Sequence, residues 1–548
     1  MTRKLTHISR TSFFEVLASL LFAAMVFLFW WQVHPEALSF QEQYQLFLFN
    51  ADYFLSDVRL PGGCADYVAE FLVQFYFYPA VGALILALVF LAVQRLTWRN
   101  MHASSSAYPL SFLPAVLLLW FMGDESVLLS YPISLLFCLL AAWLMDKKSP
   151  LLDIPLLPIL YWAAGPMALL YVLLRIIHVG ARSAWTLLWL VVIIVVAYSF
   201  VLKQWPLQSV LAGLNYYRTP LQLPALLYLV PLSVVAVVLC AQKLPSKSVA
   251  VPIAQVVLLG IIAFFAVTKG YNADKYELLK QDYLIRQEKW ADLVRRADKK
   301  VVRTTFWSNA VNLALAKQRA LADRMFDFYQ SGPDALIMRM HRDMMSNLPT
   351  AEAFFQLGMI NSAQRYYSDL QESILNGKKS GRFEQRITEC LIANGQYALA
   401  RKHLHLLQQS LFYRSWAQKA EAALKNERLI NAHPDLGRLR KYRFKSDFLY
   451  NYEEKDKMFG QLFVGNPDNK MALDYFMAQL LLDGNVKDFM QYMYWVQQYG
   501  GYQAMPVGYQ DAIKSIQSHG SDNATRYSRY VQKMLAEQQK GGSDVQAH

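Results

Sequence analysis

The chain has 548 residues, is 55% hydrophobic and 17% charged, and carries a formal net charge of +13. This positive excess is spread over a strongly apolar first half and a mixed second half, which argues against nucleic acid as a partner. The sequence has no P-loop, dinucleotide-binding glycine pattern, His-Glu-x-x-His motif or serine nucleophile elbow, so common soluble-enzyme chemistries are not indicated. The four cysteines are far apart and predict neither a disulfide framework nor a cysteine zinc site.

Residues 1–270 contain repeated apolar runs, most of them roughly 20 residues long, which is enough to cross a bilayer as helices. The first run follows basic residues but lacks a small-residue cleavage pattern, so we interpret it as a retained anchor. The stretch 150–177 is interrupted by Pro155, Pro158 and Gly165-Pro166, and it would form one kinked helix or two short ones. We therefore expect about eight or nine transmembrane helices. The uninterrupted runs are 13–31, 71–93, 110–122, 127–145, 185–202, 221–240 and 249–268.

Basic residues in the short loops predict the orientation of these helices, because Lys and Arg resist translocation. They place the N-terminus in the cytoplasm, and both loop 32–70 and the Asp124–Glu125 loop outside it. Two short helices in 150–177 give nine crossings and put the C-terminal half outside, whereas one helix gives eight and puts it inside. The charge rule favours nine. The basic residues considered are Arg3, Lys4, Arg10, Arg95, Arg99, Lys147, Lys148, Arg175, Arg182, Lys203, Arg218, Lys243 and Lys247.

Acidic residues in the first half are few and gather at two places. Residues 1–270 hold 11 of the 41 acids, six of them between positions 36 and 70, and two more are Asp124 and Glu125. Carboxylates beside hydrocarbon are costly and are often functional, although water-facing loops are the simpler interpretation.

The first outer loop alternates polar residues with aromatic ones. This pattern predicts an interfacial helix from Phe40 to Phe54, with Glu42 near its start. Pro61-Gly62-Gly63 predicts a turn, whose N–H groups would either serve the turn alone or face an anion.

From residue 271 onward the composition becomes mixed and favours helices. A glycine, a large residue and a small residue recur in the same order from Gly358, from Gly395 and, more loosely, from Gly484. Glycine would end one helix while the small residue lets the next helix pack closely, which resembles a tetratricopeptide helix pair. We predict an all-α protein: a polytopic transmembrane helical domain over 1–270, a tetratricopeptide-like α-solenoid over 271–536, and a disordered tail over 537–548.

A helical stack of this kind offers an extended concave surface, so we expect it to recruit protein partners; bracing the membrane half is the alternative. One dense basic cluster in this half could bind anions or lipid headgroups, while a solvated basic face is the simpler interpretation. The cluster consists of Arg438, Arg440, Lys441, Arg443 and Lys445.

The first loop also carries a family resemblance. Gln41-Glu42-Gln43-Tyr44 is similar to the Asp-Glu-x-x-Tyr start of the first loop in C-fold membrane glycosyltransferases, with Glu42 in the acidic place. An interfacial helix, a second acidic outer loop and a C-terminal soluble domain also resemble that family. Gln41 departs from the pattern, which has an acid at its position.

This resemblance implies transfer of a sugar from a lipid-phosphate donor, with Glu42 as the general base. Asp52 and Asp57, in the same loop, are further catalytic candidates. Asp124 or Glu125 would bind a divalent metal ion or the acceptor. The outer face supplies few cations for the phosphate, namely Arg59, Lys203 and Arg218.

The whole chain further resembles an uncharacterised family of bacterial multi-pass proteins with helical-repeat C-termini, through Leu60-Pro61-Gly62-Gly63 and Phe71-Leu72-Val73-Gln74-Phe75-Tyr76. Together with the charge rule, this implies a bacterial inner membrane with a cytoplasmic N-terminus and a periplasmic C-terminal domain. Two functions stay open. The protein is either a lipid-linked glycosyltransferase or a non-catalytic scaffold that recruits proteins through its repeats, with membrane lipids around it in both cases.

Overall fold

The structure is a computed structural model that describes residues 10–219, 223–245, 250–444, 452–518 and 525–545. Within these ranges the secondary structure is helical, apart from one isolated antiparallel β-bridge between Val127 and Tyr217. The predicted all-α class is therefore confirmed. The chain forms two compact units: unit 1 is Met1–Tyr276 with Gln409–Phe412, and unit 2 is Glu277–Gln408 with Tyr413–His548.

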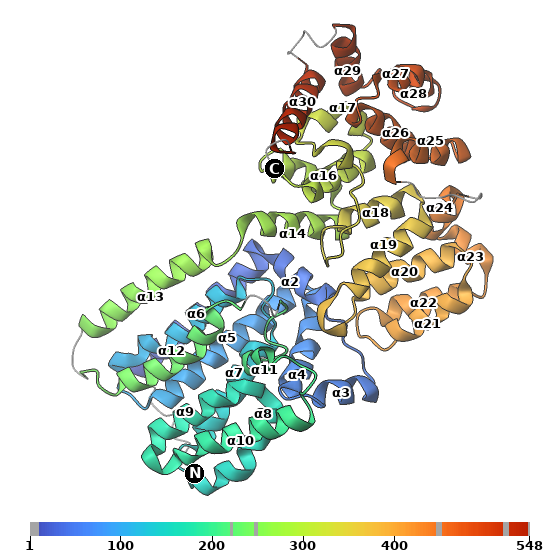
Figure 1. Ribbon diagram of the computed structural model, residues 1–548. Coiled ribbons are helices and arrows are strands. Elements are labelled where there is room, and N and C mark those ends of the chain that lie inside the picture. Colours follow the sequence, from blue (N-terminus) through green and yellow to red (C-terminus); the bar gives the residue numbers. More distant parts are fainter. Residues whose placement is uncertain (1–9, 220–222, 246–249, 445–451, 519–524, 546–548) are drawn as a thin grey trace, which may run out of the picture. The chain divides into compact units, whose positions relative to one another are not determined.

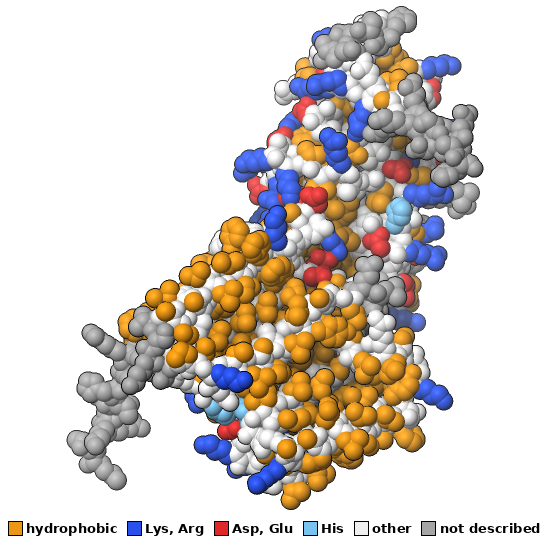
Figure 2. All heavy atoms as spheres, turned by 60° about the vertical axis from the view of Figure 1, so that its left-hand side comes forward, with side chains coloured by type: hydrophobic (Ala, Val, Ile, Leu, Met, Phe, Trp, Pro, Cys, Tyr) orange, Lys and Arg blue, Asp and Glu red, His pale blue; other side chains and the backbone are white. Residues whose placement is uncertain are grey.

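Unit 1 is a bundle of apolar helices (Figure 1). Among the described residues, five segments are long and apolar enough to cross a membrane, at Phe13–Val33, Pro79–Met101, Ser105–Met122, Pro150–Ser183 and Ala250–Lys269. Shorter apolar helices cover Ser130–Met145, Trp185–Phe200 and Leu226–Ala241. Hydrophobic side chains cover much of the surface of these helices (Figure 2), as expected where a protein faces hydrocarbon.

The helices of unit 1 are α1 (Arg10–Leu28), α2 (Pro35–Gln43), α3 (Ala51–Val58), α4 (Gly63–Val73), α5 (Pro79–Met101), α6 (Leu113–Met122), α7 (Ser130–Met145), α8 (Asp153–Ala164), α9 (Ala168–Val179), α10 (Trp185–Phe200), α11 (Leu207–Ala212), α12 (Leu226–Ala241) and α13 (Ala250–Lys269). A π-helical turn, Phe29–Val33, continues α1, and 3-10 helices cover Gln74–Phe77 and Ser105–Phe112.

The apolar helices run between two ends of the bundle. One end, which we call the acidic end, contains residues 34–78, 123–129, 213–219 and 270–276. The chain leaves α13 there, because the hydroxyl of Tyr276 donates to the carbonyl oxygen of Gly123 at 2.7 Å. The opposite end, which we call the His102 end, contains residues 100–108, 145–153 and 175–185.

Residues 150–177 form two short helices rather than one kinked helix. Gly165 separates α8 from α9 with a φ of +61°, a conformation that other residues rarely adopt. The start of α8 meets the end of α9, because Asp153 and Arg175 form an ion pair at 3.2 Å. The two helices are therefore an antiparallel hairpin with arms of roughly 18 Å, shorter than the hydrocarbon core of about 30 Å.

The single interfacial helix predicted over 40–54 is wrong. Helix α2 ends at Gln43, and α3 begins after Asn50, whose side chain accepts a hydrogen bond from the backbone N–H of Tyr53 at 2.7 Å. Asparagine at this position favours the start of a new helix. The intervening residues 44–48 are buried, so they do not form the exposed interfacial helix that the pattern predicts.

Helix pairs recur in unit 2, where short turns join α18 to α19, α20 to α21 and α26 to α27. The turn glycines Gly358, Gly395 and Gly484 have φ values of +81°, +76° and +70°. Glycine adopts this left-handed conformation without a Cβ clash, so it ends one helix and opens the turn to the next. These glycines occupy the turn positions that the sequence pattern indicates, while the solenoid arrangement and the tetratricopeptide resemblance stay predictions.

Helix α14 (Ala273–Arg286) contains the boundary between the units. The helices that follow are α15 (Trp290–Ala297), α16 (Thr305–Lys317), α17 (Leu321–Arg324), α18 (Leu348–Leu357), α19 (Ile360–Glu372), α20 (Gly381–Ala393), α21 (Tyr397–Leu407), α22 (Arg414–Ala423), α23 (Glu427–Ala432), α24 (Pro434–Tyr442), α25 (Lys455–Gly465), α26 (Lys470–Leu482), α27 (Val486–Gln491), α28 (Met493–Tyr499), α29 (Val507–Gln517) and α30 (Arg526–Val545).

The C-terminal tail differs from the prediction. Helix α30 continues to Val545, whereas composition predicts disorder over 537–548. The run Ala536-Glu537-Gln538-Gln539 consists of good helix formers, which favours continuation of the helix. Residues 546–548 lie outside the described residues.

Glu352 of α18 is a buried acid that connects three helices of unit 2. Arg386 of α20 forms an ion pair with it at 3.1 Å, and the hydroxyl of Tyr367 on α19 donates to it at 2.6 Å. Burial alone would raise the pKa of Glu352, but the Arg386 charge and the Tyr367 hydrogen bond outweigh burial and lower that pKa below 4.5. The ionised carboxylate therefore stabilises this group of helices.

Candidate functional site at the acidic end

Buried carboxylates gather at the acidic end of unit 1. They come from both acid-rich loops of the sequence, and the side chain of Gln41 brings these loops into contact. The buried acids are Glu36 and Glu42 on α2, Asp57 on α3, Asp66 and Glu70 on α4, and Glu125 before α7.

The side chain of Gln41 connects three segments. Its Nε2 donates to the backbone carbonyl oxygens of Glu125 at 2.7 Å and Val127 at 3.0 Å. Its Oε1 accepts a hydrogen bond from a terminal nitrogen of Arg218 at 2.8 Å. An ionised carboxylate could accept from Arg218 but could not donate to the two carbonyls. Glutamine at this position thus has a structural use.

Arg218 is a buried cation at the acidic end, with only 4% of its surface exposed. Its guanidinium carbon lies 5.4 Å from the ring centroid of Tyr44 and 5.8 Å from that of Phe40. Among the described residues its Nε has no hydrogen-bond partner. Burial lowers the pKa of Arg218 to about 10, although Tyr44, Glu125 and Glu70 favour its charged form, so the side chain stays charged at neutral pH. An anion beside it would supply the missing acceptor.

Asp124 and Glu125, the predicted metal or acceptor residues, both have partners within unit 1. The hydroxyl of Tyr217 donates to Asp124 at 2.6 Å, and Lys275 forms an ion pair with Glu125. The Tyr217 hydrogen bond and the β-bridge at Val127 attach the loop before α12 to the loop before α7. A metal contact at these two acids stays a prediction.

Two further acids of the first cluster are held by side chains that sequence reasoning did not consider. The hydroxyl of Tyr53 donates to Glu70, and the amide of Asn215 donates to Asp66 at 2.7 Å. Burial, followed by the charge of Glu70, raises the pKa of Tyr53, so its hydroxyl stays protonated and able to donate. Helices α3 and α4 and the loop before α12 therefore share one polar network.

The turn at Gly62 brings the first loop against the tip of the α8–α9 hairpin. The N–H of Gly62 donates to the carbonyl oxygen of Trp162 at 2.8 Å, and the N–H of Gly63 donates to that of Leu60 at 2.9 Å. A Cβ atom on Gly62 would lie 3.6 Å from the Cα of Gly165. Because both N–H groups are already used, the turn contributes packing rather than an anion site.

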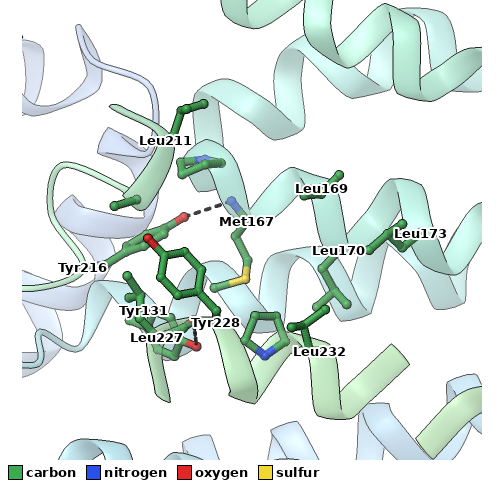
Figure 3. A pocket seen from close by; sticks show the side chains of 13 residues that line it. Tyr131, Met167, Leu169, Leu170, Leu173, Leu211, Tyr216, Leu227, Tyr228 and Leu232 are labelled. Atoms are coloured by element: carbon green, nitrogen blue, oxygen red, sulfur yellow. Dashed lines mark hydrogen bonds between the residues drawn. The ribbon is translucent and has the colours of Figure 1, made fainter. Parts of the chain in front are cut away.

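An apolar pocket of about 210 Å³ lies beside this network. Figure 3 shows leucine and tyrosine side chains from α9, α11 and α12 around it, with Tyr216 and Met167 in contact through a hydrogen bond of 3.3 Å. Tyr216 precedes Arg218 by two residues, so the pocket and the buried cation share one loop. A lining of this kind suits a hydrocarbon chain rather than a polar ligand.

The catalytic candidates in the first loop are placed differently from one another. Glu42 is buried on α2 next to Gln41, and Asp57 is buried on α3. Asp52 lies in the first turn of α3 and is exposed. Catalytic roles for these three acids stay predictions.

The basic cluster of unit 2 makes internal contacts. Arg438 donates to the carbonyl oxygen of Gln356 at 2.9 Å, and Arg443 donates to that of Ala393 at 3.1 Å. These carbonyls lie at the ends of α18 and α20, where cations satisfy unpaired acceptors. Arg440 forms an ion pair with Glu427 and Lys441 forms one with Asp468, while Lys445 lies outside the described residues. Binding of headgroups by this cluster stays a prediction.

A family model described as "Family of unknown function (DUF6057)" matches residues 9–540. The chain belongs to this family. The predicted membership of an uncharacterised family is therefore confirmed, while the DUF6057 description carries no activity and leaves the C-fold resemblance a prediction. No match to a curated protein and none to a solved structure was found.

Proposed function

We propose that this protein belongs to the bacterial envelope and transfers a sugar from a lipid-phosphate donor to an acceptor hydroxyl at the acidic end. Arg218 is the observation that carries the proposal. It is buried, flanked by aromatic rings, and its Nε has no partner among the described residues. A phosphate oxygen is the acceptor that an arginine in this setting binds best.

The apolar pocket supports a lipid as the carrier of that phosphate. It shares the loop before α12 with Arg218, so a chain in the pocket could place its headgroup near the guanidinium. The volume of about 210 Å³ accommodates part of a long chain, with the remainder in the bilayer.

The chemistry follows the C-fold resemblance. Glu42 removes the proton from the acceptor hydroxyl, and the resulting oxygen attacks the anomeric carbon of the sugar. The bond between that carbon and the phosphate oxygen breaks, and the lipid phosphate leaves with the electron pair. Arg218 stabilises the charge on this leaving group.

The proposed orientation places the N-terminus in the cytoplasm and the acidic end in the periplasm. Because Tyr276 also contacts the acidic end, we place unit 2 in the periplasm, where its helix pairs would recruit partner proteins. A reporter enzyme fused after His548 tests this placement. Reporter activity in the periplasm is expected, and activity in the cytoplasm would contradict it.

The catalytic proposal is tested in cells that carry each variant as the only copy of the protein. Glu42→Gln keeps the size of the side chain but removes the base, and a roughly 100-fold or greater loss of transfer is expected. Arg218→Gln should also lose activity, while Arg182→Gln, which changes an exposed arginine of the His102 end, should not. The measurement is mass spectrometry of the cell's glycoconjugates. An unchanged profile in Glu42→Gln cells would overturn the proposal.

A non-catalytic scaffold is the second candidate, and a cavity of about 680 Å³ in unit 2 favours it. Among the described residues, Arg303, Arg526, Arg529 and Lys533 line this cavity together with a single acid, Asp327, so the cavity suits an acidic segment of a partner protein. A photo-crosslinking residue in place of Tyr329 would capture that partner in cells. Loss of the crosslink in an Arg529→Glu background, with glycoconjugates unchanged in Glu42→Gln cells, would favour the scaffold.

A further inference from the structure

Three helices end together at the His102 end of unit 1. His102 follows the last residue of α5, Asp146 follows the last residue of α7, and His178 lies in the last turn of α9. Nε2 of His102 lies 3.3 Å from one oxygen of Asp146, and Nδ1 of His178 lies 3.6 Å from the other. Within the described residues, one atom from each of these three side chains forms a group whose members all lie within 4.8 Å of one another.

The hydrogen bonding of His178 leaves a lone pair directed at this group. Its Nε2 lies 2.9 Å from the carbonyl oxygen of Asn100, and because a carbonyl only accepts, Nε2 must carry the proton. In the neutral ring Nδ1 is then an acceptor, and it has no hydrogen-bond partner among the described residues. The side chain is only 2% exposed, so water does not readily satisfy it. Two acceptors, Nδ1 and the Asp146 carboxylate, thus face each other across 3.6 Å.

The surrounding residues fix the three side chains in place. The side-chain amide of Asn100 donates to the carbonyl oxygen of Leu139 at 3.1 Å, which attaches the end of α5 to α7. Arg175 donates to the carbonyl oxygens of Met145 at 2.6 Å and Lys148 at 3.2 Å, on either side of Asp146. A backbone carbonyl that orients a histidine through its second nitrogen is a common support for a metal ligand.

The backbone of His102 is also unusual. Its φ of 47° lies in the left-handed region, which a residue with a Cβ adopts at a cost of about 1 kcal/mol or more. This conformation ends α5 and keeps the imidazole next to Asp146. The side chain is 41% exposed, so one side of the group is open to solvent or to lipid headgroups.

We propose that His102, Asp146 and His178 bind a divalent transition-metal ion of the Zn²⁺ class. Two imidazoles and one carboxylate are ligands that Zn²⁺ prefers, and ligand atoms about 2.0–2.2 Å from the metal in a tetrahedron lie roughly 3.3–3.6 Å apart. The imidazole nitrogens lie 3.3 and 3.6 Å from different oxygens of Asp146, and one atom from each side chain lies within 4.8 Å of the other two, so a small rotation of the side chains would bring one oxygen and both nitrogens to this spacing. The fourth position, on the exposed side of His102, is left for water or a ligand. The ion would join α5, α7 and α9 where they end.

This site is separate from the acidic end. Helix α7 has 16 residues and connects Ser130 at the acidic end to Asp146, so roughly 24 Å of helix separates the two places. Metal binding at the His102 end therefore does not depend on the proposed transfer reaction. Failure of either proposal leaves the other standing.

The test uses the full-length protein, purified in detergent without a histidine tag and stripped of metal with a chelator. Zn²⁺ is titrated and bound metal is measured by equilibrium dialysis with mass spectrometry of the metal. We expect the wild type to bind one equivalent of Zn²⁺. Asp146→Asn and His178→Ala should weaken the Zn²⁺ affinity more than about 100-fold, which exceeds the effect of losing a residue that only hydrogen-bonds to a metal ligand. His405→Ala removes an exposed histidine of α21 and should leave binding unchanged.

Two results would overturn the proposal. In the first, the wild type binds no more Zn²⁺ than the double variant His405→Ala with Asp146→Asn. In the second, Asp146→Asn and His178→Ala both bind Zn²⁺ as fully as the wild type. The first result would mean that a proton rather than a metal ion lies between His178 and Asp146. If the variants do not fold, the wild type still decides. Zn²⁺ should protect the exposed His102 from diethylpyrocarbonate, mapped by peptide mass spectrometry, while His405 stays reactive, and an unprotected His102 would contradict the site.

Discussion

The ion pair between Asp153 and Arg175 permits a quantitative prediction about unit 1. Both side chains are 0% exposed, and the Nε of Arg175 lies 3.2 Å from each carboxylate oxygen of Asp153. The hydroxyl of Tyr171 donates to the same carboxylate. Asp153→Asn keeps the shape but leaves the Arg175 charge without a counter-ion. We expect a loss of about 3–5 kcal/mol in the free energy of unfolding, as for other buried pairs that lose one partner.

The assay is unfolding of the full-length protein in mixed detergent micelles, followed by the loss of helical circular dichroism as the denaturing detergent increases. Asp292→Asn is the matched control, because its pair with Arg295 is exposed and should contribute under about 1 kcal/mol. The double variant Asp153→Leu with Arg175→Met removes both charges and should recover most of the loss. A change of less than 1 kcal/mol in Asp153→Asn would refute the reasoning.

The remaining predictions concern unit 2. Gly395→Ala should lower the free energy of unfolding by about 1 kcal/mol, because alanine is strained at its φ of +76°. Gly358→Ala should lower it further, because the added Cβ would also lie 2.5 Å from the Cβ of Tyr442. Equal losses for the two variants in denaturant unfolding would contradict this reasoning. Because the pKa of Glu352 is lowered in the folded state, its ionised carboxylate stabilises the fold at pH values above the ordinary pKa of 4.5. This contribution is lost as the pH falls through the folded-state pKa. The unfolding free energies of wild type and Glu352→Gln should therefore converge in acid, and a pH-independent difference would exclude an ionised Glu352.

The apolar helices of unit 1 could be predicted from sequence because a run of about 20 hydrophobic residues has few other stable structures in a membrane. The first loop could not be predicted in the same way. Its aromatic residues suggest one amphipathic helix, but Asn50 caps a second helix and residues 44–48 are buried. The hydrophobic pattern of a short segment does not determine which other parts of the protein it packs against after folding.

The candidate sites depend on pairings between residues that are distant in the sequence. Gln41 and Arg218 are 177 positions apart, and nothing in either neighbourhood indicates that they share a hydrogen bond. The same holds for His102, Asp146 and His178, which follow three separate apolar runs. Each looks like an ordinary polar residue at the end of a membrane segment, and only the packing of α5, α7 and α9 brings them together.

The α8–α9 hairpin determines the parity of the membrane unit. By hydropathy, 150–183 is one long apolar segment, but the chain enters and leaves it at the His102 end. A topology map that treats residues 150–183 as a single membrane crossing would assign every later loop of unit 1 to the wrong side of the membrane. Straightening the hairpin into one long helix would exchange the two ends for α10, α12 and α13. The Asp153–Arg175 pair closes the base of this hairpin, so it also helps fix which loops share a compartment.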